Sequence, residues 1–247
     1  QSWSQEWRAP LRDALDWLRD ALAPLYEERA KQFLNDPWAA RDDYIDVVLN
    51  RSSRNTSKFL KSHSINEHRK GDAVTVLKLL ELQRHTMLMY TSCGWFFDEL
   101  SGIETVQVIH YAGRSIQLAQ ELFGNHIEEG FLKKLENAKS NIPEYGDGRR
   151  IYEKFIRPAM VDLTKVAAHF AVSSLFEDYE DKAEIFCYRI ELDDHQSFTS
   201  GKLKLAVGKS KLTSEVTMES DKLSFGVLHF GDHNVNAGVR AYENEED

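Results

Sequence analysis

The hydrophobic period of this chain changes near Phe176, and this change constrains the fold more than any other feature of the sequence. Before it, apolar residues such as Leu11, Leu15 and Leu18 recur every three or four positions, which is the spacing of one helix face. After it, residues 203–207 alternate between apolar and polar, which is typical of a strand. We therefore predict an α+β fold with segregated elements, a mainly helical bundle followed by a small antiparallel β-sheet.

The same change sets the expected division of the chain. We predict a helical bundle over residues 1–178, an antiparallel β subdomain over 183–240 and an acidic tail over 241–247. Proline and glycine follow this division, because the last proline is Pro158 and five glycines follow residue 183. A chain of 247 residues buries a sizeable core, so it needs no disulfide or metal to fold.

The individual elements follow from periodicity and from the positions of proline and glycine. The expected helices span residues 8–34, 36–49, 73–91, 103–123, 127–139 and 149–177, with one short helix near Phe59. Pro24 and Pro158 are expected to kink or bend the first and last helices, and Gly124 to end the fourth. The expected strands are 185–190, 203–207, 216–218, 223–230 and 235–239, joined as hairpins, with a tight turn at 231–234.

The charge balance excludes several classes of partner. The chain has 31 Lys and Arg against 40 Asp and Glu, so its formal net charge is −9. Non-specific binding to nucleic acid or to an anionic membrane surface depends on basic residues, so we expect neither as a partner. No stretch of the sequence approaches the roughly 20 apolar residues of a membrane span.

Cysteine content and the two ends of the chain indicate its setting. Two cysteines, Cys93 and Cys187, do not make a disulfide framework, and the amphipathic N-terminus does not resemble a signal peptide. We therefore expect a reduced, cytoplasmic protein. The chain begins at Gln1 without a methionine, and we expect a fragment of a longer protein, although removal of a tag would also explain this start.

The densest group of unusual residues lies between the helices expected at 73–91 and 103–123. A glycine stands at each end of the run, and Trp95, Phe96 and Phe97 are followed by Asp98 and Glu99. Aromatic faces stack on sugars and carboxylates accept bonds from sugar hydroxyls, so this content favours a carbohydrate subsite. The alternative is that the aromatic residues belong to the core, where such rings bury large areas.

Catalytic chemistry finds little support in the sequence. Glycoside hydrolysis needs two carboxylates on opposite sides of the scissile bond, and Asp98 with Glu104 lie too close in sequence to favour such a pair. Glu104 is explained by a favourable interaction with the helix dipole, and Glu81 with Arg84 by an i,i+3 ion pair on a solvated face. Cys93 is expected to be a small buried residue, so we assign no catalytic residue.

Metal and cofactor sites find equally little support. His229, Asp232 and His233 could converge at the expected turn, but their spacing matches no metal-binding signature and a solvated turn is favoured. Neither of the common phosphate-binding glycine motifs occurs in the sequence. We therefore predict no metal and no cofactor.

Three segments carry a resemblance to a known family. They are Asp36–Ile45, Leu79–His85 continuing through Met89–Glu99, and Gly102–Gln107 continuing through Tyr111–Ala112. In these segments, and in the turn Phe230–His233, the chain resembles the uncharacterised C-terminal domain of bacterial proteins related to glycoside hydrolase family 57, the α-amylase-like group. The resemblance spans nearly the whole chain.

This resemblance implies a role next to a catalytic domain. Family 57 enzymes carry a (β/α) barrel with a catalytic Glu and Asp, and a helical region after the barrel closes one side of the cleft. In several members this region supplies an aromatic–acidic segment, to which Trp95, Phe96, Phe97 and Asp98 look similar, with Gly94 where the family usually has an acid. The catalytic residues would lie upstream of this chain, which alone should be inactive.

The expected function is therefore that of an accessory portion of a family 57-like glycoside hydrolase or glucanotransferase acting on α-glucans. The implied partners are an N-terminal catalytic barrel of the same parent chain and an α-glucan or oligosaccharide. The candidate substrate-binding residues are Trp95 as a stacking platform, Asp98 or Glu99 as a hydroxyl acceptor, and then Phe96, Glu104, Arg84 and Tyr90. Two alternatives remain, a non-enzymatic helical scaffold or interaction domain, and an independent small enzyme.

Overall fold

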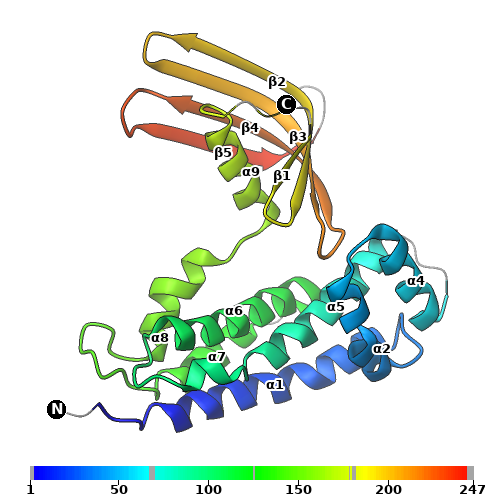
Figure 1. Ribbon diagram of the computed structural model, residues 1–247, viewed down its shortest axis with the longest axis vertical. Helices are drawn as coiled ribbons and strands as arrows, with labels where there is room; N and C mark the ends of the chain where they lie inside the picture. The colour runs from blue at the N-terminus through cyan, green and yellow to red at the C-terminus, as the bar shows by residue number, and fades with distance from the viewer. Residues whose placement is uncertain (1–2, 67–69, 125, 178, 180–181, 244–247) are drawn as a thin grey trace. The chain divides into compact units, whose positions relative to one another are not determined.

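The chain forms two compact units in the computed structural model, Gln1–Met160 and Val161–Asp247 (Figure 1). The structure describes residues 3–66, 70–124, 126–177, 179 and 182–243. The first unit, called the helical unit below, is built of helices, and the second, the sheet unit, of one helix and a five-stranded antiparallel sheet. This architecture confirms the predicted α+β class.

The helical unit follows the predicted periodicity closely. Its elements are α1 (Arg8–Ala30), α2 (Pro37–Asp43), α3 (Ile45–Leu49), α4 (Ser53–His63), α5 (Lys70–Leu88), the 3₁₀ turn η1 (Ser92–Trp95), α6 (Ile103–Phe123), α7 (Ile127–Leu135), α8 (Gly148–Ile151), the π-helical η2 (Tyr152–Ile156) and the 3₁₀ turn η3 (Arg157–Ala159). Helix α6 has the predicted bounds, because Gly124 adopts a left-handed φ of 63° that ends it.

Helix α1 provides the largest apolar stripe of the helical unit. Leu11, Leu18 and Leu22 are fully buried, and α1 packs against α5, α6 and α7. The helix continues through Pro24 instead of splitting there, which we attribute to burial of Leu22 and Tyr26 on either side of the proline. It ends at Ala30, four residues before the predicted end.

Capping residues explain where the next helices begin. The Asp36 carboxylate accepts hydrogen bonds of 3.0 Å from the backbone N–H groups of Trp38 and Ala39, as its position before Pro37 predicts. The predicted helix 36–49 is interrupted at Tyr44, so it forms α2 and α3. The short helix expected near Phe59 is α4.

The predicted single helix over 149–177 is wrong, and its interruption marks the division between the units. The chain passes through η2 and η3, and Met160 is extended. Asp162 then caps a new helix, α9 (Leu163–Ser173), by accepting a 2.7 Å bond from the N–H of Lys165. The structural division thus follows Met160, whereas the sequence places the bundle boundary at residue 178.

The sheet is a simple antiparallel meander in the order β1–β2–β3–β4–β5. Its strands are β1 (Lys182–Ile185), β2 (Tyr188–Ser200), β3 (Leu203–Ser214), β4 (Ser220–His229) and β5 (Val235–Ala241). Helix α9 covers one face of β3, β4 and β5 (Figure 1). Phe170 of α9 is fully buried and meets Phe225 of β4 edge to face, with ring centroids 5.8 Å apart.

Two of the predicted strands are wrong in detail. Residues 185–190 form a tight hairpin, because Ile185 pairs with Tyr188 and Phe186 takes a positive φ of 55° at the turn. Residues 216–218 belong to the connection between β3 and β4, where Met218 has a φ of 60°. Neither turn contains glycine or Asn-Gly, so the usual hairpin signal is missing from the sequence.

The remaining expectations concern the last turn and the ends of the chain. Gly231 and Asp232 have positive φ values, and the Asn234 carbonyl accepts a 2.9 Å bond from the N–H of Phe230, which confirms the predicted tight turn. Residues 244–247 of the expected acidic tail lie outside the described residues. Across the described ranges, none of the helices combines the length and apolar character needed to cross a membrane.

Candidate functional site

The aromatic run lies in the segment that joins α5 to α6. It begins in η1, where Thr105 of α6 donates a 2.8 Å hydrogen bond to the carbonyl oxygen of Gly94. A Cβ at Gly94 would lie 2.1 Å from Cγ2 of Val108, so glycine is required for η1 to approach α6 this closely. Packing of the turn therefore accounts for the glycine that precedes Trp95.

Trp95 is half-buried. The ring stacks on Trp7 with centroids 6.4 Å apart and an angle of 13° between the planes. Trp7 is buried, and its Nε1 donates a 3.1 Å hydrogen bond to the backbone carbonyl of Asp98. The two tryptophans thus attach the aromatic run to the start of α1, and only part of Trp95 remains for a ligand.

The two phenylalanines of the run point into solvent. Phe96 is 77% exposed and Phe97 is 49% exposed. Their rings meet edge to face with centroids 5.3 Å apart. The aromatic run is therefore neither wholly core nor wholly surface, because Trp95 packs against the core while Phe96 and Phe97 do not.

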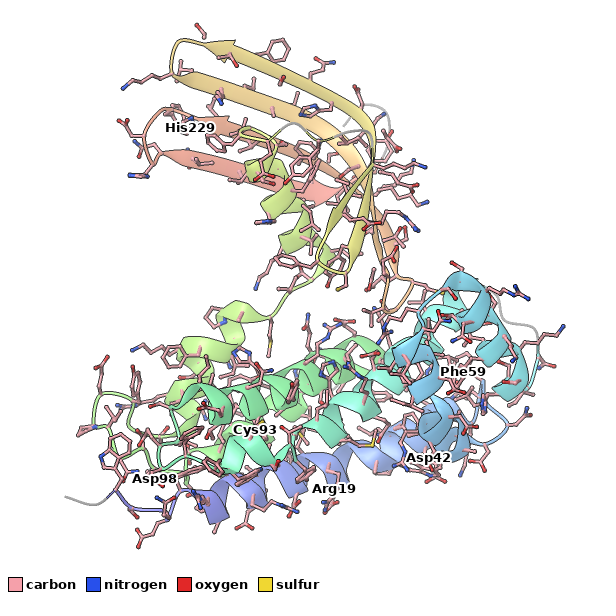
Figure 2. All side chains as sticks on the ribbon, in the orientation of Figure 1. Arg19, Asp42, Phe59, Cys93, Asp98 and His229 are labelled. Carbon is pink, nitrogen blue, oxygen red and sulfur yellow. The ribbon has the colours of Figure 1, made fainter. Side chains whose placement is uncertain are left out.

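Asp98 and Glu99 are neighbours in sequence but differ in their surroundings. The Asp98 carboxylate is exposed, accepts a 2.8 Å hydrogen bond from the amide of Gln5 and lies 4.0 Å from the guanidinium of Arg8 (Figure 2). Most of its surface faces water, so Asp98 can accept a hydrogen bond from a ligand hydroxyl.

Glu99, by contrast, is buried and its carboxylate is already occupied. Its oxygens accept hydrogen bonds from the backbone N–H and hydroxyl of Ser101, from the Ser140 hydroxyl and from the N–H of Asn141. Burial acts to raise the pKa of Glu99, but these hydrogen bonds outweigh it and hold the pKa below its ordinary value. Glu99 therefore links two loops, and we do not retain it as a ligand acceptor.

Of the other three candidates, Glu104 lies beside the aromatic run, where its backbone oxygen would be 3.2 Å from a Cβ at Gly94, whereas Arg84 and Tyr90 have partners outside the run. Glu104 is half-buried in the first turn of α6, which agrees with a role at the helix N-terminus. Arg84 pairs with Glu81 at 3.1 Å, and the Tyr90 hydroxyl donates a 2.8 Å hydrogen bond to Asp16. The seven candidates thus fall into at least three environments.

Glu81 is the centre of a buried ionic cluster that the sequence interpretation did not anticipate. The predicted ion pair with Arg84 forms, but the solvated face is wrong, because Glu81 is 2% exposed. Tyr44 and Arg51 also donate hydrogen bonds of 2.8 Å and 2.7 Å to its carboxylate. Burial acts to raise the pKa of Glu81, but these donors and the two arginines keep it lowered.

His85 completes this cluster from the next turn of α5. Its Nε2 lies 3.6 Å from a Glu81 oxygen, and its ring lies 5.9 Å from that of Tyr111. Burial lowers the pKa of His85 to about 4, so the ring is neutral at pH 7. Its Nδ1 is buried and has no hydrogen-bond partner among the described residues. The cluster therefore joins α5 to the segment that contains Tyr44 and Arg51.

Tyr90 borders a groove of about 310 Å³ between α1, α2 and α5. Arg12 and Arg19 of α1 lie over the Tyr90 ring, at 4.6 Å and 5.7 Å from its centroid. Burial raises the pKa of the Tyr90 hydroxyl, and its hydrogen bond to Asp16 acts in the same direction. Sequence reasoning found Tyr90 but missed the groove, because its walls come from three separated segments.

A second hollow, of about 570 Å³, lies on the sheet. Gly226 and Gly238, which are paired across β4 and β5, leave its floor without side chains. Lys209 lines it too, with Nζ 5.2 Å from the centroid of the Tyr242 ring. None of the predicted site residues borders this hollow.

The remaining chemical candidates lie apart from both hollows. His229 Nε2 is 3.1 Å from the backbone carbonyl of Asp232, and within the described ranges no three His, Cys, Asp or Glu side chains are arranged to hold a metal. Cys93 and Cys187 are both free and exposed, so the expected burial of Cys93 is wrong. In η1 the buried position is taken by Gly94, which turns Cys93 outward.

Comparison with known proteins places the chain in one family. The family model described as a domain of unknown function, DUF3536, matches residues 3–247. The chain therefore belongs to the DUF3536 family. No curated protein and no solved structure matches it.

Proposed function

We propose that this member of the DUF3536 family is an accessory portion of a glycoside hydrolase or glucanotransferase related to family 57, and that it contributes binding subsites for an α-glucan. In this proposal the helical unit packs on the catalytic barrel of its parent chain, which holds the catalytic Glu and Asp. The order of the described elements supports a catalytic domain separate from this chain. Here helices are followed by an antiparallel meander, whereas a (β/α) barrel alternates strands and helices.

One observation carries the proposal. Phe96 and Phe97 expose two aromatic rings to water beside the half-buried Trp95, and the exposed Asp98 carboxylate follows them directly. Exposed aromatic rings give the apolar faces of a sugar a surface to stack on, while a carboxylate accepts its hydroxyl hydrogens. A reduced, cytoplasmic setting is part of the same proposal and is supported by the two free thiols.

The proposal predicts that malto-oligosaccharides bind at the aromatic run. We expect maltoheptaose to change the tryptophan fluorescence, because Trp95 adjoins the exposed rings. Phe96→Ala and Phe97→Ala should each weaken binding about fivefold, since loss of one stacked ring removes about 1 kcal/mol. Titration calorimetry on the full-length parent protein and on this chain measures both effects.

Phe186→Ala is the matched control, because Phe186 is 91% exposed but lies in the sheet unit. Its affinity for maltoheptaose should equal that of the wild type. The absence of any response from the full-length parent, or an unchanged affinity in both Phe96→Ala and Phe97→Ala, would contradict the proposal.

A second candidate function is that of an interaction module without enzymatic activity. It is favoured by Ile103, which is 80% exposed at the start of α6 and follows the same loop as Phe96 and Phe97. Exposed apolar side chains of this kind mark protein interfaces as well as sugar sites. Concentration-dependent association in sedimentation velocity, lost in Ile103→Ser and without a response to sugars, would favour this function over the first.

A further inference from the structure

The groove between α1, α2 and α5 has an unusual lining for an acidic chain. Arg12, Arg19 and Arg41 line it. Each is also paired with a carboxylate, Arg12 and Arg19 with Asp16, Arg19 also with Asp20, and Arg41 with Asp42. The three carboxylates beside these arginines balance their charge, so what the groove offers a ligand is guanidinium N–H donors and not a net positive charge. Figure 2 shows Arg19 on α1, the helix that forms one wall.

Aromatic rings and neighbouring carboxylates both hold these arginines in place. Arg12 lies 4.6 Å from the centroid of the Tyr90 ring, and Arg41 lies 5.1 Å from that of Trp38. A guanidinium stacked on a ring keeps its N–H donors in its own plane, where they can pair with an oxyanion. Arg12 uses its Nε for Asp16, and neither of its terminal nitrogens has a hydrogen bond among the described residues.

A buried amide in the same groove lacks a partner. Gln83 of α5 lines the groove, is 4% exposed, and its Nε2 has no hydrogen-bond partner within the described part of the chain. Buried amide groups are nearly always paired, and an unpaired one destabilises the fold. An acceptor atom of a bound molecule would satisfy it.

We propose that this groove binds a small organic oxyanion, a phosphate ester or carboxylate carried on a hydroxylated body of about one sugar ring. The oxyanion pairs with the terminal nitrogens of Arg12 and with Nη1 of Arg41, since Nε and Nη2 of Arg41 are bonded to Asp42. The body lies against Trp38 and Tyr90, and an oxygen of the ligand accepts the Gln83 N–H. A volume of about 310 Å³ suits a molecule of this size and excludes a folded partner. The proposal is independent of the aromatic run and of any α-glucan.

The first experiment compares ligands that differ in whether they carry a negative charge and in whether a phosphate or a carboxylate supplies it. Titration calorimetry uses glucose 6-phosphate, glucuronate, inorganic phosphate and uncharged glucose with the full chain. We expect at least one of the two charged sugars to bind with a Kd below about 1 mM, and glucose to bind at least tenfold more weakly. Affinity should fall as salt rises, because the pairing is ionic.

The relative affinities of the four ligands identify the group that the groove binds or contradict the proposal. Preference for glucose 6-phosphate identifies a phosphate ester, and preference for glucuronate identifies a carboxylate. Binding of inorganic phosphate as tight as that of glucose 6-phosphate removes the role of the sugar body. No binding below the millimolar range by any anion, or equal binding of glucose, would overturn the proposal.

Two variants test the assigned residues. Arg41→Gln should weaken binding of the charged sugar tenfold or more, because it removes a charge-assisted pair. Arg54→Gln, which changes an arginine of α4 outside the lining residues, is the control and should leave the affinity unchanged.

Gln83→Met separates a ligand contact from a structural contact. Methionine keeps the length of the side chain but has no N–H, so the ligand-free protein should melt at a higher temperature while its affinity for the charged sugar falls. A lower melting temperature with unchanged affinity would show that the Gln83 amide serves the fold alone. Phe96→Ala should leave the binding of the charged sugar unchanged, so this proposal and the α-glucan proposal fail separately.

Discussion

The helical unit and the sheet unit bury different kinds of polar groups. The helical unit encloses carboxylates, of which Glu81 is 2% exposed and Glu99 is 5% exposed. The polar side chains buried in the described part of the sheet unit are three hydroxyl groups and one imidazole, namely Ser210, Ser214, Thr217 and His229. Buried charges need partners in fixed positions, so the helical unit depends on directional contacts in addition to its apolar core, whereas the sheet unit buries no carboxylate among its described residues.

This difference indicates that the helical unit is the better candidate for a functional site, because it holds polar side chains in fixed positions. A buried carboxylate fixes the arrangement of the donors around it, as Glu81 does for Arg51 and Tyr44. The two units can also be followed separately, because all five tryptophans precede Val161. Tryptophan fluorescence therefore reports unfolding of the helical unit, while amide hydrogen exchange reports both units. Three predictions use this separation.

The largest effect is expected in the core of the sheet unit. Phe170→Ala removes a fully buried ring that packs against Phe225 and Tyr179, so the sheet unit should lose about 4 kcal/mol of stability. Hydrogen exchange in β3 and β4 should accelerate while the fluorescence midpoint stays unchanged. The control is Phe198→Ala, at an exposed position of β2. A parallel loss in the fluorescence transition would mean that the two units unfold together.

A smaller effect is expected for the buried carboxylate of the helical unit. Glu81→Gln removes the negative charge that faces Arg51 and Arg84, and should destabilise the helical unit by about 3 kcal/mol. The fluorescence midpoint in urea should fall, and the exchange rates in the sheet should not change. Glu144→Gln, which removes an exposed partner of Lys154 in the same unit, is the control and should change stability by less than about 1 kcal/mol. Equal effects of both substitutions would show that burial of the Glu81 carboxylate does not matter.

The smallest of the three effects is a pH dependence of the helical unit. Burial lowers the pKa of His85 from 6.5 to about 4, so between these values the unfolded chain binds more protons than the native one. Stability should therefore fall as the pH decreases through this window, by about 2 kcal/mol at pH 5 relative to neutral pH. In His85→Gln the free energy of unfolding should decrease less between neutral pH and pH 5 than in the wild type. An identical pH dependence of the wild type and the variant, measured by fluorescence in urea, would contradict this prediction.

Local sequence signals predicted much of the fold. The helix α6 was predicted at its observed bounds, because a long apolar period ends at a glycine with no Cβ to hinder a left-handed conformation. The antiparallel sheet was predicted from alternation and short connections, but not which face is buried, because Leu203 and Val207 are exposed and Ala206 is fully buried. The Asp36 cap was predicted because it acts on the two nearest N–H groups.

The misses have different physical causes. The helix expected over 149–177 breaks because Asp162 caps α9, a signal present in the sequence but masked by the continuing apolar period. The hairpin at Phe186 lacks a turn signature, so packing of Ile185 and Ile190 decides it. The adjacent acids Asp98 and Glu99 look alike in the sequence, yet the loop from Ser140 covers only one of them.

The sequence by itself determined the fold class, most of the helices and the antiparallel character of the sheet, because those depend on periods and caps within a few residues. Only the tertiary structure decided which polar groups are enclosed. Glu81 became the centre of an ionic cluster, and Gln83 came to line a groove with arginines from α1 and α2, because segments far apart in the chain meet there. Burial, and with it charge state and availability to a ligand, is a property of these distant contacts and not of local sequence.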